Sequence, residues 1–150
     1  MNKEKLKKIL QEHKKWLSDE GGERADLFGA DLSEADLREA DLREADLFKA
    51  DLAGANMEGA SLNEAYLRWA SLEGANLFEA NIAGANMEEA NLAGANMEGA
   101  SLYGADLRGA DLRGADLSET NLVKANLRGA DLAEANLRGA NLRGANLKLN

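Results

Sequence analysis

The chain has 150 residues and a formal net charge of −9, and it contains no Cys and no Pro. This length suits one domain, and the lack of Cys excludes disulfide bonds and fits a reducing compartment, so we expect a cytoplasmic protein. The negative charge disfavours direct binding to nucleic acid. The sequence shows neither a signal peptide nor an apolar run long enough to cross a membrane.

Residues 1–24 differ in character from the rest of the chain and predict an amphipathic α-helix followed by a short linker. Asn2 can cap the start of the helix, and Gly21 and Gly22 can end it. The residues that recur at helical spacing on one face are Leu6, Ile9, Leu10, His13, Trp16 and Leu17.

Two roles fit this helix. It can cover the apolar end of the structure that follows, or it can lie on a membrane surface, since the segment holds seven basic and five acidic residues. We favour the cap, because the apolar face is short and the lysines are interleaved with acidic residues. We therefore expect no membrane partner.

Residues 25–149 repeat one pattern, Ala-(Asp/Asn)-Leu-x-x, 25 times without insertion or deletion. Ala holds the first place of every pentad except at Thr120, and the third place is Leu except at Met57, Ile82, Met87 and Met97. An α-helix turns about 100° per residue, so a period of five cannot keep one stripe buried. A flat strand needs a period of two. The chain is therefore predicted to coil about an axis with Ala and Leu pointing inward.

The fifth place of each pentad is predicted to lie in a turn. Gly occupies 13 of these places, where a type II turn needs a positive φ. Glu or Lys fills most of the others, so either a positive φ is tolerated there or the turn type varies.

This array resembles the pentapeptide-repeat family over about five-sixths of the chain. The resemblance implies an all-β solenoid, namely a right-handed quadrilateral β-helix with four pentads in each coil. It is preceded here by the predicted capping α-helix, which gives two parts, residues 1–24 and residues 25–150. The 25 pentads would make six coils and one further pentad, a rod roughly 30 Å long.

Outward-facing residues that are twenty apart in sequence are predicted to stack in columns along this rod. One column begins with Phe28, Phe48 and Arg68, and Tyr66 and Trp69 lie beside it. Exposed aromatic side chains on a polar rod indicate a partner-binding patch. The same residues can instead stack on one another or receive the N-terminal helix.

Charge divides the array into two parts. Residues 25–99 hold 16 acidic and 4 basic residues, whereas residues 100–150 hold 6 acidic and 7 basic residues. Many of the acidic residues are the Asp at the second place of a pentad, whose simplest role is to accept a hydrogen bond from nearby backbone. An acidic half can also select basic partners.

The sequence offers no pattern typical of catalysis, cofactor binding or metal binding. Its single His lies in the predicted helix, no Ser accompanies a base, and no phosphate-binding loop or calcium-binding repeat is found. We expect a non-catalytic scaffold or protein-interaction module without a cofactor, whose protein partner is unidentified. The resemblance offers an alternative, in which the acidic rod mimics DNA and modulates or protects DNA gyrase or topoisomerase IV, as in quinolone resistance. An ice-binding face is disfavoured because Thr120 is the only Thr.

The C-terminal coil is predicted to leave Leu142, Leu147 and Leu149 uncovered, because the helix can cover only the opposite end. A second copy placed end to end would cover the same surface on both partners. The cross-section of the rod is small, so we expect a weak homodimer.

Overall fold

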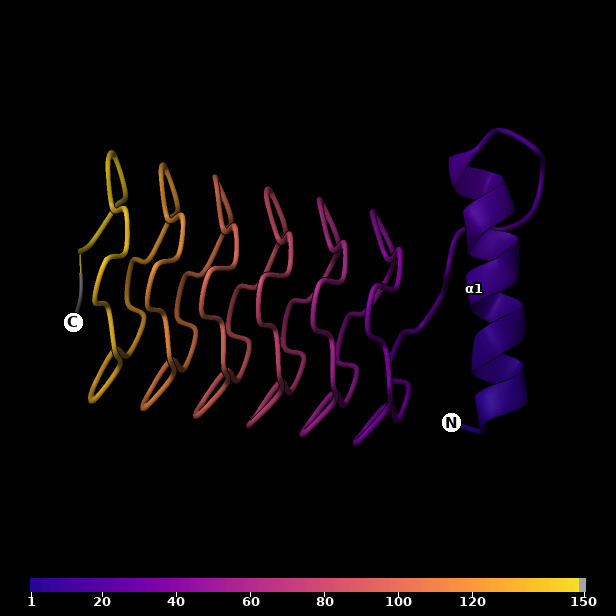
Figure 1. Cartoon of the computed structure of the whole chain (residues 1–150), viewed down its shortest axis with the longest axis horizontal. Helices are drawn as coiled ribbons and strands as arrows, with labels where there is room; N and C mark the ends of the chain where they lie inside the picture. Colours follow the sequence, from indigo (N-terminus) through magenta and orange to yellow (C-terminus); the bar gives the residue numbers. More distant parts are fainter. Residues whose placement is uncertain (149–150) are drawn as a thin grey trace.

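The computed structural model describes residues 1–148, which form one α-helix and a stack of similar coils (Figure 1). Helix α1 spans Lys3–Leu17 and lies across the N-terminal end of the stack, perpendicular to its long axis. Asn2 caps α1, as predicted, because its side chain accepts a hydrogen bond from the Lys5 N–H. Within residues 1–148, no helix is long and apolar enough to span a membrane.

The coils are joined by parallel β-bridges between residues twenty apart in sequence, from Asp26 with Asp46 to Asn126 with Asn146. Each bridge is made at the second place of a pentad, and no longer strand is formed within the described residues. The Leu27 N–H donates to the Asp46 carbonyl at 2.7 Å, and the Asp46 N–H donates to the Ala25 carbonyl at 2.9 Å. A register of twenty means that four pentads complete one coil.

A tight turn follows each inward-facing Leu. In the first pentad the Ala30 N–H donates to the Leu27 carbonyl at 3.0 Å, which closes a four-residue turn. Every fifth place from Gly29 to Gly144 has a φ between +54° and +75°, whether it holds Gly, Glu, Lys or Trp. The turn type therefore does not vary with the residue. The Glu, Lys and Trp residues at the fifth place adopt a left-handed backbone conformation, which normally costs a residue other than Gly about 1–2 kcal/mol.

The core is a narrow column of Leu and Ala side chains along the axis. The third-place residues from Leu27 to Leu127 are buried, as are the first-place Ala residues through the middle of the stack. The Met and Ile substitutions at the third place occupy the same buried positions as Leu. The inward orientation predicted from the period of five is thus observed.

The second place of each pentad stabilises the turn that follows it. Every Asp or Asn at this place accepts a hydrogen bond from the backbone N–H two residues later, as Asp46 does from Phe48 at 3.0 Å and Asn91 does from Ala93 at 3.0 Å. Stacked Asn side chains also bond to one another, because the Asn76 amide donates to the Asn56 side chain at 3.0 Å. The repeated Asp and Asn residues are therefore accounted for by the backbone.

The two ends of the stack differ in how well they are covered. At the N-terminal end, Leu6, Ile9 and Leu10 of α1 pack against the core, and all four third-place Leu residues of residues 25–44 are buried. At the C-terminal end, the corresponding side chains of the last described coil are half-buried or exposed. These are Leu132, Leu137, Leu142 and Leu147.

Candidate functional site: an aromatic strip

Four exposed or half-exposed aromatic residues lie together on one face of the first three coils. They are Phe28, Phe48, Tyr66 and Trp69, and together with their basic neighbours Arg24, Lys49 and Arg68 we call them the aromatic strip. The rings of Phe28 and Phe48 stack with centroids 5.5 Å apart and planes 15° apart. The ring of Phe48 meets Trp69 with centroids 5.4 Å apart. Phe28 is 60% exposed, Tyr66 is 49% exposed and Trp69 is 45% exposed, so the stack remains accessible to solvent.

Both Trp69 and Tyr66 depart from the repeat at places where the repeat has a clear preference. Trp69 holds a fifth place at φ +60°, a conformation that Gly adopts without cost and a bulky residue does not. Tyr66 holds a second place, where it forgoes the side-chain bond that Asp or Asn makes to the turn. Residues held against a local preference are candidates for function.

Basic side chains border the aromatic rings. The Lys49 ammonium lies 5.1 Å from the centroid of Trp69 and 5.6 Å from that of Phe48. The Arg68 guanidinium lies 4.5 Å from the Trp69 centroid, and that of Arg24 lies 5.5 Å from the Tyr66 centroid. Such contacts are favourable because the ring faces are electron-rich. The strip thus combines aromatic surface with three positive charges.

The strip ends in a row of charged residues in the same column. Arg68 Nε lies 3.3 Å from Glu88 Oε2, outside hydrogen-bond geometry, and Arg108 Nη2 lies 3.4 Å from the same oxygen. Arg108 also pairs with Asp106 at 2.7 Å. From Arg68 onward the column holds only charged residues, so the aromatic surface is confined to the N-terminal coils.

The other arginines of the acidic half are engaged elsewhere. Arg38 contacts Asp36 through two hydrogen bonds of 2.8 and 2.7 Å, and Arg43 contacts Asp41 in the same way. The hydrogen bond from Arg38 lowers the pKa of Asp36 to about 2. Residues 25–99 hold only four basic residues. Two of these four face their own acids, and the other two, Lys49 and Arg68, lie in the strip.

The structure brings all five residues predicted for the patch to one face. Phe28, Phe48 and Trp69 form one stack, and Arg68 lies over Trp69, whereas Tyr66 contacts Arg24. Sequence reasoning missed Arg24 and Lys49. The position of Lys49, twenty residues before Trp69, could have revealed its place in the column. Arg24 precedes the array, and no pattern marked it.

Of the three residues predicted at the C-terminal end, two are described. Leu142 is half-buried and Leu147 is 42% exposed. Leu149 lies outside the described residues.

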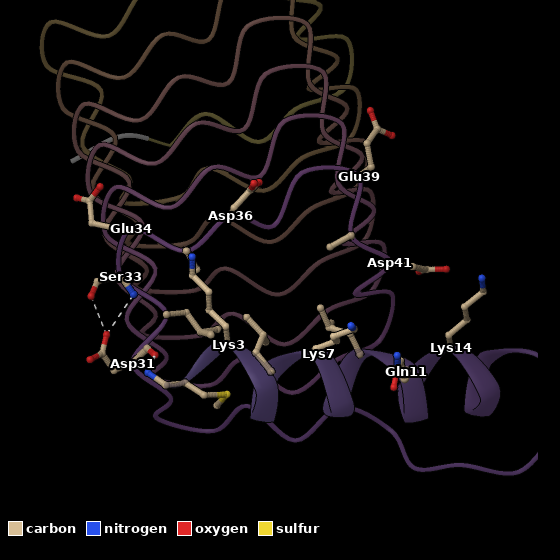
Figure 2. Close-up of a pocket in the computed structure, with 16 residues that line it drawn as sticks. Lys3, Lys7, Gln11, Lys14, Asp31, Ser33, Glu34, Asp36, Glu39 and Asp41 are labelled. Atoms are coloured by element: carbon tan, nitrogen blue, oxygen red, sulfur yellow. Dashed lines mark hydrogen bonds between the residues drawn. The ribbon is translucent and has the colours of Figure 1, made fainter.

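A separate groove of about 910 Å³ lies between α1 and the first coil (Figure 2). Lys3 and Lys7 of α1 border it on one side, and Asp36 and Asp41 of the coil border it on the other. It contains none of the residues of the aromatic strip. No group of three or more His, Cys, Asp or Glu side chains suited to a metal ion is found in residues 1–148.

Comparison with known proteins agrees with the architecture. The family model described as pentapeptide repeats matches in eight copies, over residues 25–63, 40–77, 60–98, 70–114 and 110–148. The chain therefore belongs to the pentapeptide-repeat family. No curated protein is significantly similar to it.

Two solved structures illustrate the likeness. A pentapeptide-repeat protein, Rfr23, from the cyanobacterium Cyanothece 51142 is 26% identical, over 83% of this chain and 89% of that chain, with a TM-score of 0.51. A trypsin-treated variant of QnrB1, a plasmid-mediated fluoroquinolone resistance protein, is 23% identical, over 81% of this chain and 76% of that chain, with a TM-score of 0.67. The likeness to QnrB1 concerns the fold alone.

Proposed function

We propose that this chain is a non-catalytic scaffold or protein-interaction module that binds a protein partner through the aromatic strip. The observation that carries this proposal is the exposed stack of Phe28, Phe48 and Trp69 with basic side chains around it. Aromatic and Arg side chains are the residue types most enriched at the energetic centres of protein interfaces. Outside the strip, the other large exposed aromatic residue of the described coils, Tyr103, stands apart from the stack.

We also infer that the described part of the predicted repeat region, residues 25–148, forms a right-handed quadrilateral β-helix, an all-β solenoid, and that residues 1–24 form its cap. The twenty-residue register and the turns at every fifth residue support four sides per coil. The similarity to solved pentapeptide-repeat proteins supports the handedness. We propose a cytoplasmic location, because a chain with no Cys fits a reducing compartment.

A binding role rather than catalysis is supported by how the reactive groups are used. His13, the only histidine, is buried, and both of its ring nitrogens bond to backbone groups, so it cannot serve as a general base. The Ser33 hydroxyl donates to the Asp31 carboxylate at 2.7 Å, and a carboxylate alone does not make Ser a nucleophile. Before the last described coil, most backbone N–H groups of the turns donate to carbonyl groups within the turn or in the next coil, so they are not free to bind a substrate.

The proposal is tested by photo-crosslinking in the native host. A benzophenone amino acid is placed at position 28, and the control places it at position 103, because Tyr103 is a similarly exposed aromatic residue that is bordered by Lys124. We expect a protein to be crosslinked from position 28 and not from position 103. Equal labelling from the two positions, or none from position 28, would contradict docking on the strip.

DNA gyrase or topoisomerase IV remains the alternative partner. The excess of acidic residues in residues 25–99 favours it, since a rod with negative charge can mimic DNA. Two observations disfavour it. The ion pairs of Asp36 and Asp41 reduce the negative charge, and residues 100–150 hold seven basic and six acidic residues. A gyrase supercoiling assay with and without a quinolone separates the two proposals. If the chain has no effect on supercoiling at low salt, gyrase is excluded as the partner.

We further propose weak end-to-end association of two copies through the C-terminal coil. Leu142 and Leu147 offer apolar surface there, and the adjoining charges nearly cancel. A two-fold contact would cover the same side chains on both copies. Its area would fall near or below the roughly 1,000 Å² that a stable interface needs, so the dimer would depend on concentration.

A further inference from the structure

We propose that the aromatic strip binds an amphipathic α-helix that lies along the axis of the coils and carries acidic residues on its flanks. This inference rests on the proposed function, because it assumes that the strip is the docking surface. It adds the class of partner and its direction on the rod.

The spacing of the aromatic rings favours a helix over other peptide conformations. The rings lie in successive coils with centroids 5.5 Å and 5.4 Å apart, and stacked coils advance about 4.8 Å along the axis. An α-helix advances about 5.4 Å per turn, so side chains at i, i+3 or i+4, and i+7 meet successive rings in register. An extended strand places same-face side chains about 6.6 Å apart, and polyproline II advances about 9 Å per turn. Both lose register within three coils.

Charge favours acidic flanks on the bound helix. Lys49 forms no ion pair within residues 1–148, and the Arg24 guanidinium is 4.0 Å from the Asp46 carboxylate, at the limit of an ion pair. Lys49 lies over the Phe48 and Trp69 rings, and Arg24 lies over the Tyr66 ring. The remaining surface of residues 25–99 is strongly acidic and repels an acidic partner. Attraction at the strip and repulsion around it together fix the position of the partner.

Exposure supports a contact of about three helical turns. The accessible rings are Phe28 in the first coil, Phe48 in the second and Trp69 in the third, and the Arg68 and Glu88 pair closes the strip beyond them. A helix of about 11 residues spans three turns. A contact of this size is small, so we expect fast exchange and a strong dependence on salt.

Three peptides of about 18 residues, of which the first two are stapled, test this inference against the full chain. The first has Leu or Phe at i, i+3 or i+4, and i+7, with Glu on both flanks. The second replaces every flanking Glu by Lys. The third keeps the Leu or Phe and Glu residues of the first but has no staple and carries central prolines, which prevent a helix. We expect the first peptide to bind about tenfold or more tightly than either of the others, and to weaken as salt is added.

Matched variants locate the binding. Trp69→Gly places in that turn the residue most common at the fifth place, so the fold should persist. We expect Trp69→Gly and Lys49→Glu each to weaken the first peptide about tenfold, and Tyr103→Ala to leave it unchanged. Equal affinity for the Glu and Lys peptides, tighter binding of the proline peptide, or no binding of the first peptide would overturn the inference.

These outcomes separate the inference from the proposed function. A protein crosslinked from position 28 through an extended segment would refute the helical partner and leave the docking surface in place. Binding of the acidic helix to the strip without any crosslinked protein in the host would refute the proposed function and support the preference for a helix.

Discussion

The Nδ1 atom of His13 accepts a hydrogen bond from the Ala25 N–H at 3.0 Å, which joins α1 to the first residue of the array. Because Nδ1 is the acceptor, Nε2 carries the proton, and it donates to the Arg43 carbonyl at 3.0 Å. The ring of Trp16 stacks on His13 with centroids 5.6 Å apart. A neutral imidazole thus fastens the helix to both ends of the first coil.

This arrangement predicts that the attachment of α1 weakens in mild acid. Burial lowers the pKa of His13 below its usual value, and the positive charges of the Arg43 and Arg24 side chains lower it further. The hydrogen bond to the Arg43 carbonyl and the negative charge of Asp41 raise the pKa, but they do not outweigh burial. Its contribution to stability is therefore complete above the unfolded value of about 6.5 and is lost as the pH falls from there through the lowered pKa. We expect the protection factors of the α1 amides, which compare observed with intrinsic exchange rates, to fall across this window.

NMR titration of the single histidine measures the effect directly. A His13→Gln chain serves as the control, because Gln can accept and donate hydrogen bonds without titrating, and the protection factors of its α1 amides should not change with pH in this range. A ring that titrates at or above the ordinary value would contradict the account.

The core predicts a sharp contrast between inward and outward substitutions. Leu92 is buried, so Leu92→Asp leaves a charge without a partner and should cost about 4 kcal/mol or more. Leu92→Met should cost less than about 1.5 kcal/mol, since Met97 already occupies the equivalent place one pentad later. Glu88→Gln removes only partly exposed ion pairs and should cost less than about 1 kcal/mol. Urea unfolding measures all three, and similar losses for Leu92→Asp and Glu88→Gln would refute the orientation of the pentads.

Two glycines are predicted to differ in what they tolerate. Gly104 has φ +64° with open space around it, so Gly104→Ala should cost only the left-handed conformation, about 1 kcal/mol. Gly22 has φ +81°, and a Cβ there would collide with the Glu12 carbonyl and the Lys15 Cβ. We expect Gly22→Ala to cost clearly more and to loosen α1. Thermal unfolding that ranks the two substitutions the other way would be inconsistent with the linker path.

The open C-terminal coil predicts association that depends on protein concentration. Leu147 is 42% exposed at this end, and Leu147→Lys adds a charge to the surface that two copies would share. We expect light scattering to detect a dimer at high concentration in the unaltered chain and a monomer in Leu147→Lys. A monomer at every concentration, or a dimer that the substitution leaves intact, would exclude this contact.

Much of the architecture could be predicted from the period of the sequence. The period of five determines which residues point inward, and the Gly residues indicate the turns, but the sequence could not decide how Glu34 or Lys49 would behave in the same turn. The structure shows both at positive φ, because the backbone N–H of each residue donates a hydrogen bond to a carbonyl of the next coil, which fixes the turn. The ladder between coils therefore overrides the local preference of the residue.

The candidate site was predictable only in part. Columns of twenty placed Phe28 and Phe48 on one face, whereas the contacts of Arg24 with Tyr66 depend on how the linker enters the array. The role of His13 was also hidden, since its two hydrogen bonds reach backbone groups 12 and 30 residues away. Contacts of this kind come from the path of the chain and leave no periodic pattern.

The most direct test of docking on the aromatic strip is the yield of the crosslinked partner in a chain that carries the crosslinker at position 28 together with Trp69→Gly. Trp69 lies one coil beyond the Phe48 ring that the crosslinker would contact, so the substitution removes binding surface without removing the reactive group. The account predicts a yield lower by about tenfold, with unchanged far-UV circular dichroism. An unchanged yield from a folded chain would contradict it.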